Sequence, residues 1–399
     1  MSEIAFLFLK GMIILKLLVA PDSFKGTLSA VQAATIIAEA FRKVLPIESA
    51  VLLPLGDGGE GTAEALIGAG GQAVICPTTD GYGEPVDVRY CILNQTAIID
   101  SASVVPMHAK QRRPEIASTY GLGAPILDAL QRGCRRILLG LGGTGSNDGG
   151  CGLAASLGVR FFDSDGVAFV PFGETLGQIQ DYDTAGAEAI LRGISIQGLC
   201  DVKNPFFGAS GAAHVFAPQK GAAPETVRLL DQGMEALAGV IVRTSGMDLQ
   251  LLPGSGAAGG LGGGIAAWLN GTLTSGIQAV LELLSFRTRA AEADLIITGE
   301  GCSDEQTLMG KAVSGVLQAA GSTPVLVLSG MVRAVDEALR AHGAAAVCGV
   351  NRVEADFQSV ARTAAAVLAD EAANAARLLA LGQKLGSAGR LCSTESADS

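Results

Sequence analysis

Three strand-like apolar runs each lead into a loop that carries acidic residues, and two of these loops also carry a lysine. The loops span residues 21–26, 56–62 and 298–311. In α/β proteins, ligands bind in the crevice at the carboxyl ends of parallel strands. If the three strands are parallel neighbours, their loops face one crevice. Acids, lysines and glycines in such a place suit the binding of phosphate groups and of a magnesium ion.

The carboxylates of these loops are candidate metal ligands. Asp57 and Glu60 lie among glycines that permit close approach of the backbone to a ligand. Mg²⁺ binds through one or two carboxylates together with phosphate oxygens. Glu300, in the third loop, is a further candidate for the metal or for its water shell. Asp22, in the first loop, could hold Mg²⁺ or a substrate hydroxyl.

The lysines and their polar neighbours are candidate ligands for anions. Lys25 and Lys311 would offset the charge of phosphate or carboxylate groups, and Ser23 lies close to Lys25. The N-terminus of the helix expected after the first loop adds to its affinity for anions. The further candidates for nucleotide or substrate binding in the third loop are Asp304, Gln306 and Thr307.

Two motifs in the middle of the chain add candidates. After the apolar run 137–141, a glycine-rich segment offers backbone amides and side chains to a phosphate or substrate; its candidates are Gly142, Gly143, Thr144, Ser146 and Asn147. In the segment 200–205, Asp201 is our candidate general base for a hydroxyl proton, with Asp22 as the substitute. Lys203 and Asn204 are binding candidates there. An ordinary Asx-type turn is the alternative interpretation of this segment.

The same glycine-rich segment supports a competing function. Gly140, Gly142 and Gly145 match G-x-G-x-x-G after a strand, and Asp163 ends a later strand-like run, as in a dinucleotide fingerprint. An NAD-dependent oxidoreductase is therefore an alternative. A P-loop is excluded because Glu305 stands where the motif ending at Lys311 needs a glycine, and the G-x-S-x-G motif is absent.

Composition narrows the class of protein. The net charge is −11 without a basic run, so nucleic acid is not an expected partner. The eight cysteines form no C-x-x-C pair, which fits reduced thiols in a cytoplasmic protein. No apolar run is long enough to span a membrane, and the apolar N-terminus lacks a charged n-region and a cleavage site. Met12 is an alternative start to Met1.

The order of elements indicates the fold. A strand at 12–20, a helix capped by Ser29, a strand at 50–55 and a helix from Thr62 give a β-α-β-α start. The alternation is lost over 77–290 and resumes from Asp294. We therefore predict an α/β fold with a discontinuous doubly wound parallel-sheet domain and an inserted α+β domain. The predicted bounds are 12–76 plus 291–385 for the first, 77–290 for the second, and 386–399 for a disordered tail.

Six motifs in this order resemble the bacterial glycerate kinase family of type I. They are A-P-D-S-F-K-G at 20–26, G-D-G-G-E-G-T at 56–62, G-G-T-G-S-N-D-G-G at 142–150, C-D-V-K-N-P at 200–205, P-Q-K-G at 218–221 and T-G-E-G followed by D-E-Q-T and G-K at 298–311. The resemblance covers roughly 12–385. It implies a flavodoxin-like discontinuous domain, Mg²⁺ dependence, and ATP-dependent phosphorylation of D-glycerate, commonly to 2-phosphoglycerate. A homodimer is compatible with it.

One residue departs from the family pattern. Where the family typically reads Gly-Glu-Gly-Arg, this chain has Cys302. Arginine gives planar, permanently charged recognition of carboxylate or phosphate, so the loop lacks one anion ligand, for which Lys311 or Lys25 could compensate. A non-catalytic protein that binds a nucleotide or a hydroxy acid is therefore a second alternative.

Overall fold

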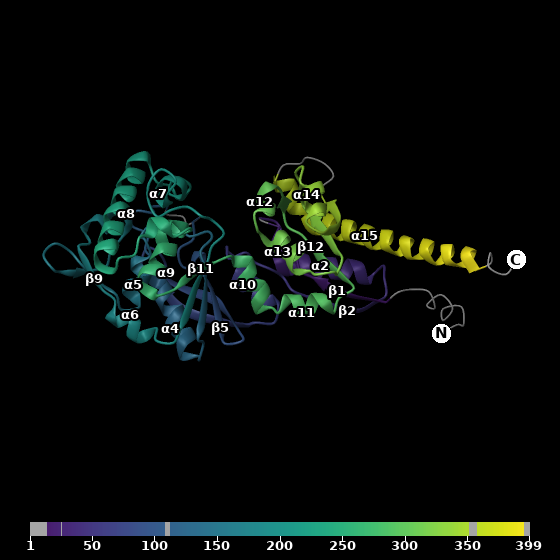
Figure 1. Cartoon of the computed structure of the whole chain (residues 1–399), viewed down its shortest axis with the longest axis horizontal. Coiled ribbons are helices and arrows are strands. Elements are labelled where there is room, and N and C mark those ends of the chain that lie inside the picture. The colour runs from purple at the N-terminus through teal and green to yellow at the C-terminus, as the bar shows by residue number, and fades with distance from the viewer. Residues whose placement is uncertain (1–13, 25, 108–111, 351–356, 395–399) are drawn as a thin grey trace. The chain divides into compact units, whose positions relative to one another are not determined.

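The structure is a computed structural model in which two compact units are described separately (Figure 1). It describes residues 14–24, 26–107, 112–350 and 357–394. Unit 1 contains the described residues up to Leu55 and from Leu284 onward, and unit 2 is Gly56–Leu283. The chain therefore leaves unit 1 once and returns to it once, which is the arrangement of a discontinuous domain with an insertion.

The sheet of unit 1 has five strands, all parallel to their neighbours. Numbered along the chain within the unit, the strands lie in the order 2-1-3-4-5, which is the flavodoxin-like doubly wound order. The predicted fold class is confirmed. The strands are β1 (Leu15–Val19), β2 (Ile47–Leu52), β12 (Leu295–Thr298), β14 (Val325–Ser329) and β16 (Ala344–Gly349). A separate short pair consists of β13 (Cys302–Ser303) and β15 (Met331–Val332).

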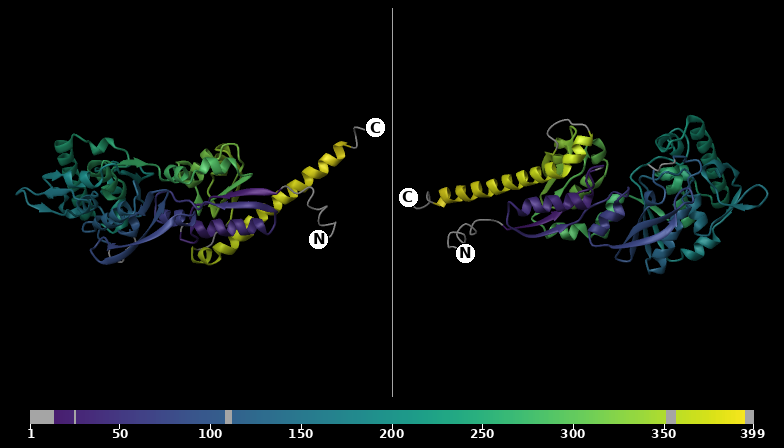
Figure 2. Two further views of the ribbon diagram at one scale, coloured as in Figure 1. Left: turned by 90° about the horizontal axis from the view of Figure 1, so that it is seen from below. Right: turned by 180° about the vertical axis from the view of Figure 1, so that it is seen from behind.

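The helices of unit 1 bury the apolar faces of this sheet. They are α2 (Ala30–Arg42), α11 (Phe286–Ala291), α12 (Glu305–Leu308), α13 (Ala312–Ala319), α14 (Asp336–Ala341) and α15 (Phe357–Thr394). Ser29 caps α2 in a capping box, as the sequence predicts. Ile37 and Phe41 of α2 are buried in one core with strand residues and with Leu368 of α15. In Figure 2, α15 runs beside α2 and continues past it.

The predicted disordered tail does not begin at residue 386. The helix α15 continues to Thr394, and only residues 395–399 of that prediction lie outside the described residues. The stretch 381–394 contains glycines but no proline. Once a helix is nucleated, each further residue adds one backbone hydrogen bond, so a segment without proline can extend it.

Unit 2 contains a six-stranded mixed sheet. Its strands, in spatial order, are β11 (Thr272–Thr274), β10 (Ser195–Leu199), β6 (Arg136–Gly140), β5 (Thr96–Asp100), β4 (Pro85–Leu93) and β3 (Gln72–Thr79). The first four are parallel to one another, whereas β4 pairs antiparallel with both β5 and β3. A small antiparallel sheet contains β7 (Arg160–Phe162), β8 (Ala168–Phe169) and β9 (Asp181–Asp183).

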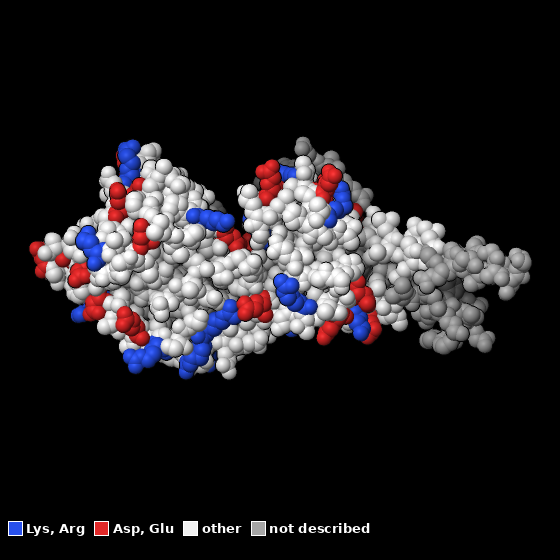
Figure 3. All heavy atoms as spheres, in the orientation of Figure 1, with Lys and Arg blue, Asp and Glu red and all other residues white. Residues whose placement is uncertain are grey.

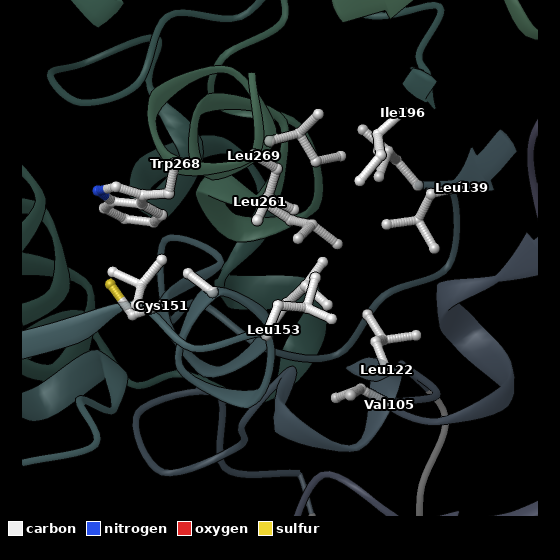
Figure 4. Close-up of a cluster of buried hydrophobic side chains, with 14 of the residues drawn as sticks. Val105, Leu122, Leu139, Cys151, Leu153, Ile196, Leu261, Trp268 and Leu269 are labelled. Carbon is white, nitrogen blue, oxygen red and sulfur yellow. The ribbon is translucent and has the colours of Figure 1, made fainter. Parts of the chain in front are cut away.

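The helices of unit 2 complete a second core. They are α3 (Thr62–Gly68), α4 (Gly123–Gln131), α5 (Cys151–Ser156), α6 (Ala185–Ile190), α7 (Ala212–Phe216), α8 (Pro224–Ser245), α9 (Leu261–Leu269) and α10 (Gly276–Leu283). Trp268 of α9 lies among buried aliphatic side chains (Figure 4) and meets the Phe161 ring edge-on at 5.1 Å. Unit 2 therefore has a hydrophobic core of its own.

The N-terminal boundary of the insertion differs from the predicted one at 77. Unit 2 begins at Gly56, so it takes in the glycine-rich loop, α3 and β3. The reason is strand pairing: β3 pairs with β4 from Gln72 to Thr79, and α3 packs against β4 and β5. The alternation of strand and helix continues across the boundary, which hides it from a reading of the sequence. At the other end, unit 2 closes at Leu283 instead of 290.

Acidic and basic side chains are interspersed on the faces of both units that Figure 3 shows. Within the described part of the chain, no helix combines the length and the apolar character that crossing a membrane requires.

Candidate active site

In unit 1, two of the three predicted loops meet where the strand order reverses. The loop after β1 and the loop after β12 are joined by a hydrogen bond from the Asp22 backbone N–H to the Gly299 carbonyl, at 2.9 Å. Beside it, Thr298 Oγ1 donates to the Ala20 carbonyl at 2.8 Å. Doubly wound folds bind their ligands at this switch point. The loops 21–26 and 298–311 therefore form one candidate site.

Glu300 is the central carboxylate of this site. It is only 8% exposed. Its Oε1 accepts hydrogen bonds from Ser303 Oγ at 2.9 Å and from Thr307 Oγ1 at 2.7 Å, and Ser303 Oγ also lies 2.7 Å from Ser329 Oγ. Burial raises the pKa of Glu300, while the two hydroxyls and the Lys311 ammonium oppose that rise. The structure thus brings the predicted residues Glu300 and Thr307 together, and the Thr307 hydroxyl helps to hold the Glu300 carboxylate in place.

The other predicted residues of the third loop form its frame. Asp304 Oδ1 accepts the Gln306 N–H at 2.9 Å and caps α12. Lys311 Nζ donates to Gln306 Oε1 at 2.8 Å. Lys311 stands directly before α13, and the positive end of a helix favours an anion. Asp304 and Gln306 therefore hold the loop, and Lys311 supplies its positive charge.

The first loop contributes one acid to the described site. Asp22 is 7% exposed, and its Oδ1 accepts the Ser23 N–H at 2.6 Å. Ser23 itself is half-buried. Lys25, the predicted cation of this loop, lies outside the described residues.

Sequence reasoning missed a guanidinium beside Cys302. In the parallel pair of β13 and β15, Cys302 lies opposite Met331, and the next N–H, that of Arg333, donates to the Ser303 carbonyl at 2.9 Å. Arg333 Nε lies 3.3 Å from the Met331 sulfur. Burial raises the pKa of the Cys302 thiol, and the Arg333 charge opposes this rise. A neighbouring strand thus places an arginine near the position where the loop lacks one.

The three strands before the predicted loops are parallel neighbours in the order β2-β1-β12, as the sequence predicts. The remaining loop, 56–62, belongs to unit 2, and a crevice shared by all three loops stays a prediction. The strand β2 ends at Leu52, and the chain enters unit 2 at Gly56. There the loop packs on the carboxyl ends of the parallel strands. The Gly142 N–H donates to the Gly58 carbonyl at 3.2 Å, and a Cβ on Gly58 would collide with Leu199 at the end of β10. Unit 2 thus has a candidate site at its own sheet edge.

Asp57 and Glu60 are differently placed in this loop. Asp57 is half-buried, and its Oδ1 accepts the Gly59 N–H at 3.1 Å, whereas Glu60 is exposed. Glu300, the third predicted metal ligand, lies in the other unit. No group of three or more His, Cys, Asp or Glu side chains that could hold a metal ion occurs within the described ranges. Because Mg²⁺ commonly takes only one or two carboxylates, with phosphate oxygens and water, Asp57 and Glu60 stay predicted ligands of this ion.

Asp201 lies at the same edge of unit 2. It is exposed, directly after β10, and its Oδ1 accepts the N–H of Gly276 at 3.2 Å. The backbone of Gly276 also touches the Asp57 carbonyl, since a Cβ there would overlap it. The structure therefore brings Asp201 and Asp57 to one place. Of its predicted companions, Lys203 is exposed, and Asn204 Nδ2 donates to the Ser210 carbonyl at 2.8 Å, which is a structural contact.

The glycine-rich segment after β6 presents its backbone but buries its side chains. Gly142 is exposed and Gly143 is partly so, whereas Thr144, Ser146 and Asn147 are at most 2% exposed. Thr144 Oγ1 donates to the Leu141 carbonyl at 2.7 Å. Ser146 Oγ and Asn147 Oδ1 are buried without a hydrogen-bond partner among the described residues. Direct binding of a ligand by these three side chains stays a prediction.

The buried lysine Lys220 holds the backbone of the glycine-rich segment by a hydrogen bond. Lys220 is 3% exposed, and its Nζ donates to the Ser146 carbonyl at 2.6 Å. Burial lowers the pKa of Lys220 to about 7, against the opposing charge of Asp148. Asp148 is itself buried and accepts Thr119 N–H and Oγ1, both at 2.7 Å. The lysine of the P-Q-K-G motif therefore has a structural role, because it is buried and bonds the backbone of the glycine-rich segment.

The topology contradicts the dinucleotide interpretation. A Rossmann fingerprint needs a strand, a glycine turn and a helix that leads to a parallel neighbour. Here the helix α5 begins at Cys151, well after Gly145, and has only six residues. Asp163 follows β7, which belongs to a separate antiparallel sheet, and the parallel partners of β6 are β5 and β10.

Two residues at the end of β5 were also missed. Asp100, 7% exposed, accepts backbone N–H groups of the loop 56–62 and of α3. Ser101 Oγ donates to the Gly140 carbonyl at 2.6 Å and lies 2.5 Å from Thr144 Oγ1. Their position at the carboxyl end of a buried strand could have identified them in the sequence. Unlike the predicted loops, however, this position has no cluster of glycines beside it.

Comparison with known proteins agrees with this architecture. The glycerate kinase from Bacillus subtilis (strain 168) is 38% identical over 82% of this chain and 88% of its own length. The glycerate 2-kinase of Escherichia coli (strain K12) is 34% identical over 93% and 99%. A crystal structure from Salmonella typhimurium LT2, which carries the name glycerate kinase 2, superposes with a TM-score of 0.83 at 36% identity, covering 93% of this chain and 100% of that one.

The family model described as the glycerate kinase family matches residues 17–380. This range includes both candidate sites and the return of the chain into unit 1. The chain belongs to the glycerate kinase family.

Proposed function

We propose that this chain catalyses the ATP-dependent phosphorylation of D-glycerate and that 2-phosphoglycerate is the product. The choice of hydroxyl follows the name of the Escherichia coli relative, glycerate 2-kinase, which is aligned over 93% of this chain. The observation that carries the proposal is the presence of acids and lysine at the carboxyl ends of parallel strands in both units, with Glu300 buried at the switch point of unit 1.

Asp57 and Glu60 are the residues that would hold Mg²⁺. They are oxygen donors on a loop whose glycine backbone can approach phosphate closely. The bound ion would neutralise charge on the transferring phosphoryl group. Glu300 stays a proposed metal or water-shell ligand in its own unit, as a buried carboxylate whose Oε1 is held by the Ser303 and Thr307 hydroxyls.

The reaction needs a base for the glycerate hydroxyl. In our proposal, the hydroxyl oxygen attacks the γ-phosphorus of ATP in line, the bond to the β,γ-bridging oxygen breaks, and ADP leaves. Asp201 accepts the hydroxyl proton; its side chain is exposed and follows β10, and its Oδ1 accepts the Gly276 N–H. Asp22 is the substitute base. Lys311, and Lys25 as a sequence-based candidate, offset the charge of phosphate or glycerate carboxylate.

A coupled assay of ADP release tests this proposal. With D-glycerate, ATP and Mg²⁺, ADP must appear in proportion to D-glycerate, and L-glycerate serves as the control substrate. The competing candidate is a non-catalytic binding protein, which the cysteine at position 302 favours. ADP at the level of the substrate-free background, together with saturable binding of ATP or glycerate by calorimetry, would support the binding protein and contradict the kinase.

We infer a cytoplasmic location from the cysteines. Those in the described part of the chain are all free thiols, which is usual in a reducing compartment. A homodimer stays a prediction.

A further inference from the structure

Asp100 is a buried carboxylate that the proposed reaction does not use. It ends β5 and is only 7% exposed. Its Oδ2 accepts the Gly61 N–H at 3.0 Å, and both of its oxygens lie 3.2 Å from the Ala63 nitrogen. A carboxylate that accepts several backbone N–H groups makes strong, charge-assisted hydrogen bonds. Asp100 therefore fixes backbone groups of a different part of the chain.

The groups that Asp100 holds are the end of the glycine-rich loop and the start of α3. Gly61, the residue before α3, has φ 92° and no side chain with which to cap the helix. The first N–H groups of a helix need an external acceptor. Asp100 supplies this acceptor from the neighbouring strand, so one side chain caps the helix and anchors the loop.

This anchoring determines where Asp57 and Glu60 lie. Gly58 lies between β10 and α10, since a Cβ there would contact Leu199 and Gly276. The loop is thus packed against the sheet near Asp57 and hydrogen-bonded to the sheet beyond Glu60. Between these two attachments, Glu60 is exposed.

We propose that Asp100 is a positioning residue, whose charged carboxylate holds the loop 56–62 in the conformation in which Asp57 and Glu60 bind the magnesium–nucleotide complex. This inference rests on the proposed function. Asp100 itself touches backbone N–H groups and acts on the ligand only through the loop.

The charge of Asp100 makes the positioning sensitive to pH. Burial raises its pKa to about 7, the N–H groups of Ala63 and Gly61 oppose this rise, and the charge of Glu60 adds to it. The Cys91 thiol on β4 also faces Asp100, and its own pKa is raised by burial, by the charge of Asp100 and by that of Glu64 on α3. A protonated Asp100 has one oxygen fewer to accept N–H bonds. The loop should therefore loosen as pH falls below about 7.

Three variants of the full chain test the inference: Asp100→Asn, Asp100→Glu and the control Asp128→Asn. Asp128 is another acid of unit 2. It accepts a hydrogen bond from the Tyr90 hydroxyl at 2.6 Å and, among the described residues, is not bonded to the loop 56–62. Two properties are measured for each: amide hydrogen exchange of the peptide containing 58–63, without ligand, and KM for MgATP against pH.

Asp100→Asn should speed exchange in this peptide and raise KM for MgATP by about tenfold or more, the equivalent of 1.4 kcal/mol or more. It should also abolish the fall in wild-type affinity between pH 8 and 6. Asp100→Glu keeps the charge and should lie between wild type and Asn in both measurements. Asp128→Asn should change neither property.

Unchanged exchange at 58–63 and unchanged KM in Asp100→Asn would overturn the inference. So would an equal effect in Asp128→Asn, because the change would then be a general loss of stability. If Asp100→Asn does not fold, Asp100→Glu decides: exchange and KM identical to wild type would contradict positioning by this carboxylate. If the wild type shows no kinase activity, the proposed function fails, while the exchange experiment still reports on Asp100.

Discussion

Replacing Lys220 with methionine should make unit 2 more stable at neutral pH and less stable in alkali. Lys220 is 3% exposed, and its Nζ donates to the Ser146 carbonyl at 2.6 Å. Burial lowers its pKa from 10.5 to about 7. In the folded protein the amine therefore loses its proton near neutrality, whereas in the unfolded chain it keeps the proton until about pH 10.

The sign of the pH effect follows from proton binding. Between pH 7 and 10.5 the unfolded chain binds the Lys220 proton and the folded chain does not, so the free energy of unfolding rises with pH. A difference of about 3.5 pKa units at 1.36 kcal/mol each corresponds to about 5 kcal/mol across this range. Wild-type stability should thus increase from pH 7 to pH 10 by up to about that amount.

Methionine removes this dependence but leaves the Ser146 carbonyl without its donor. An unsatisfied buried acceptor costs about 1–3 kcal/mol. At pH 7 the variant should therefore be about 2–4 kcal/mol more stable than wild type, which is the 5 kcal/mol avoided minus this cost. Near pH 10 it should be less stable than wild type. The two stability curves should cross.

Urea unfolding followed by tryptophan fluorescence measures the effect. Trp268 is the single tryptophan of the chain, is 2% exposed, and lies in unit 2 together with Lys220. Lys203→Met, a change of an exposed lysine in the same unit, is the control and should leave the pH dependence as in wild type. Parallel curves for wild type and Lys220→Met from pH 7 to 10 would refute the reasoning, since they would mean that Lys220 keeps its proton in the folded state.

Three further variants test the candidate sites. Asp201→Asn should lower kcat by about 100-fold or more if Asp201 is the base; near-normal turnover in the coupled assay would remove it from that role. Thr307→Val deletes a hydroxyl that lowers the pKa of Glu300, so the acid limb of the kcat profile should move to higher pH, and an unmoved limb would separate Glu300 from catalysis. Cys302→Arg should raise kcat/KM about tenfold, as an added charge-assisted contact would, and more in an Arg333→Ala background; no gain in either background would show that position 302 does not contact an anion.

The fold of unit 1 was readable because each of its elements carries a local signal. Ser29 caps a helix whose buried face includes Ile37 and Phe41, and the apolar runs before Asp22 and Glu300 are strands of the sheet. These signals place two loops at one switch point once parallel order is assumed. The division at Gly56 could not be read, because β3 pairs with β4 by register, and register is a property of the folded sheet.

The candidate site could be predicted where its residues lie on loops that follow strands, and could not be predicted where its residues are buried and hold the backbone of those loops. Asp57 and Asp201 each follow a strand, and this position at the end of a strand predicted them as site residues. Asp100 and Lys220 act through backbone groups distant in sequence, Gly61 and the Ser146 carbonyl, so only the folded structure reveals their partners. Thr144 and its neighbours had the right chemistry, yet folding turns them inward.

The central proposal is phosphoryl transfer from ATP to D-glycerate, and detection of the phosphorylated product tests this transfer most directly. Purified chain incubated with ATP, Mg²⁺ and D-glycerate is followed by phosphorus NMR. We predict that ATP is converted to ADP while an equal amount of 2-phosphoglycerate appears. When D-glycerate or Mg²⁺ is omitted, ATP should stay intact and no phosphoglycerate should form. ATP that stays intact in the complete mixture, or ADP that forms without any phosphoglycerate, would contradict it.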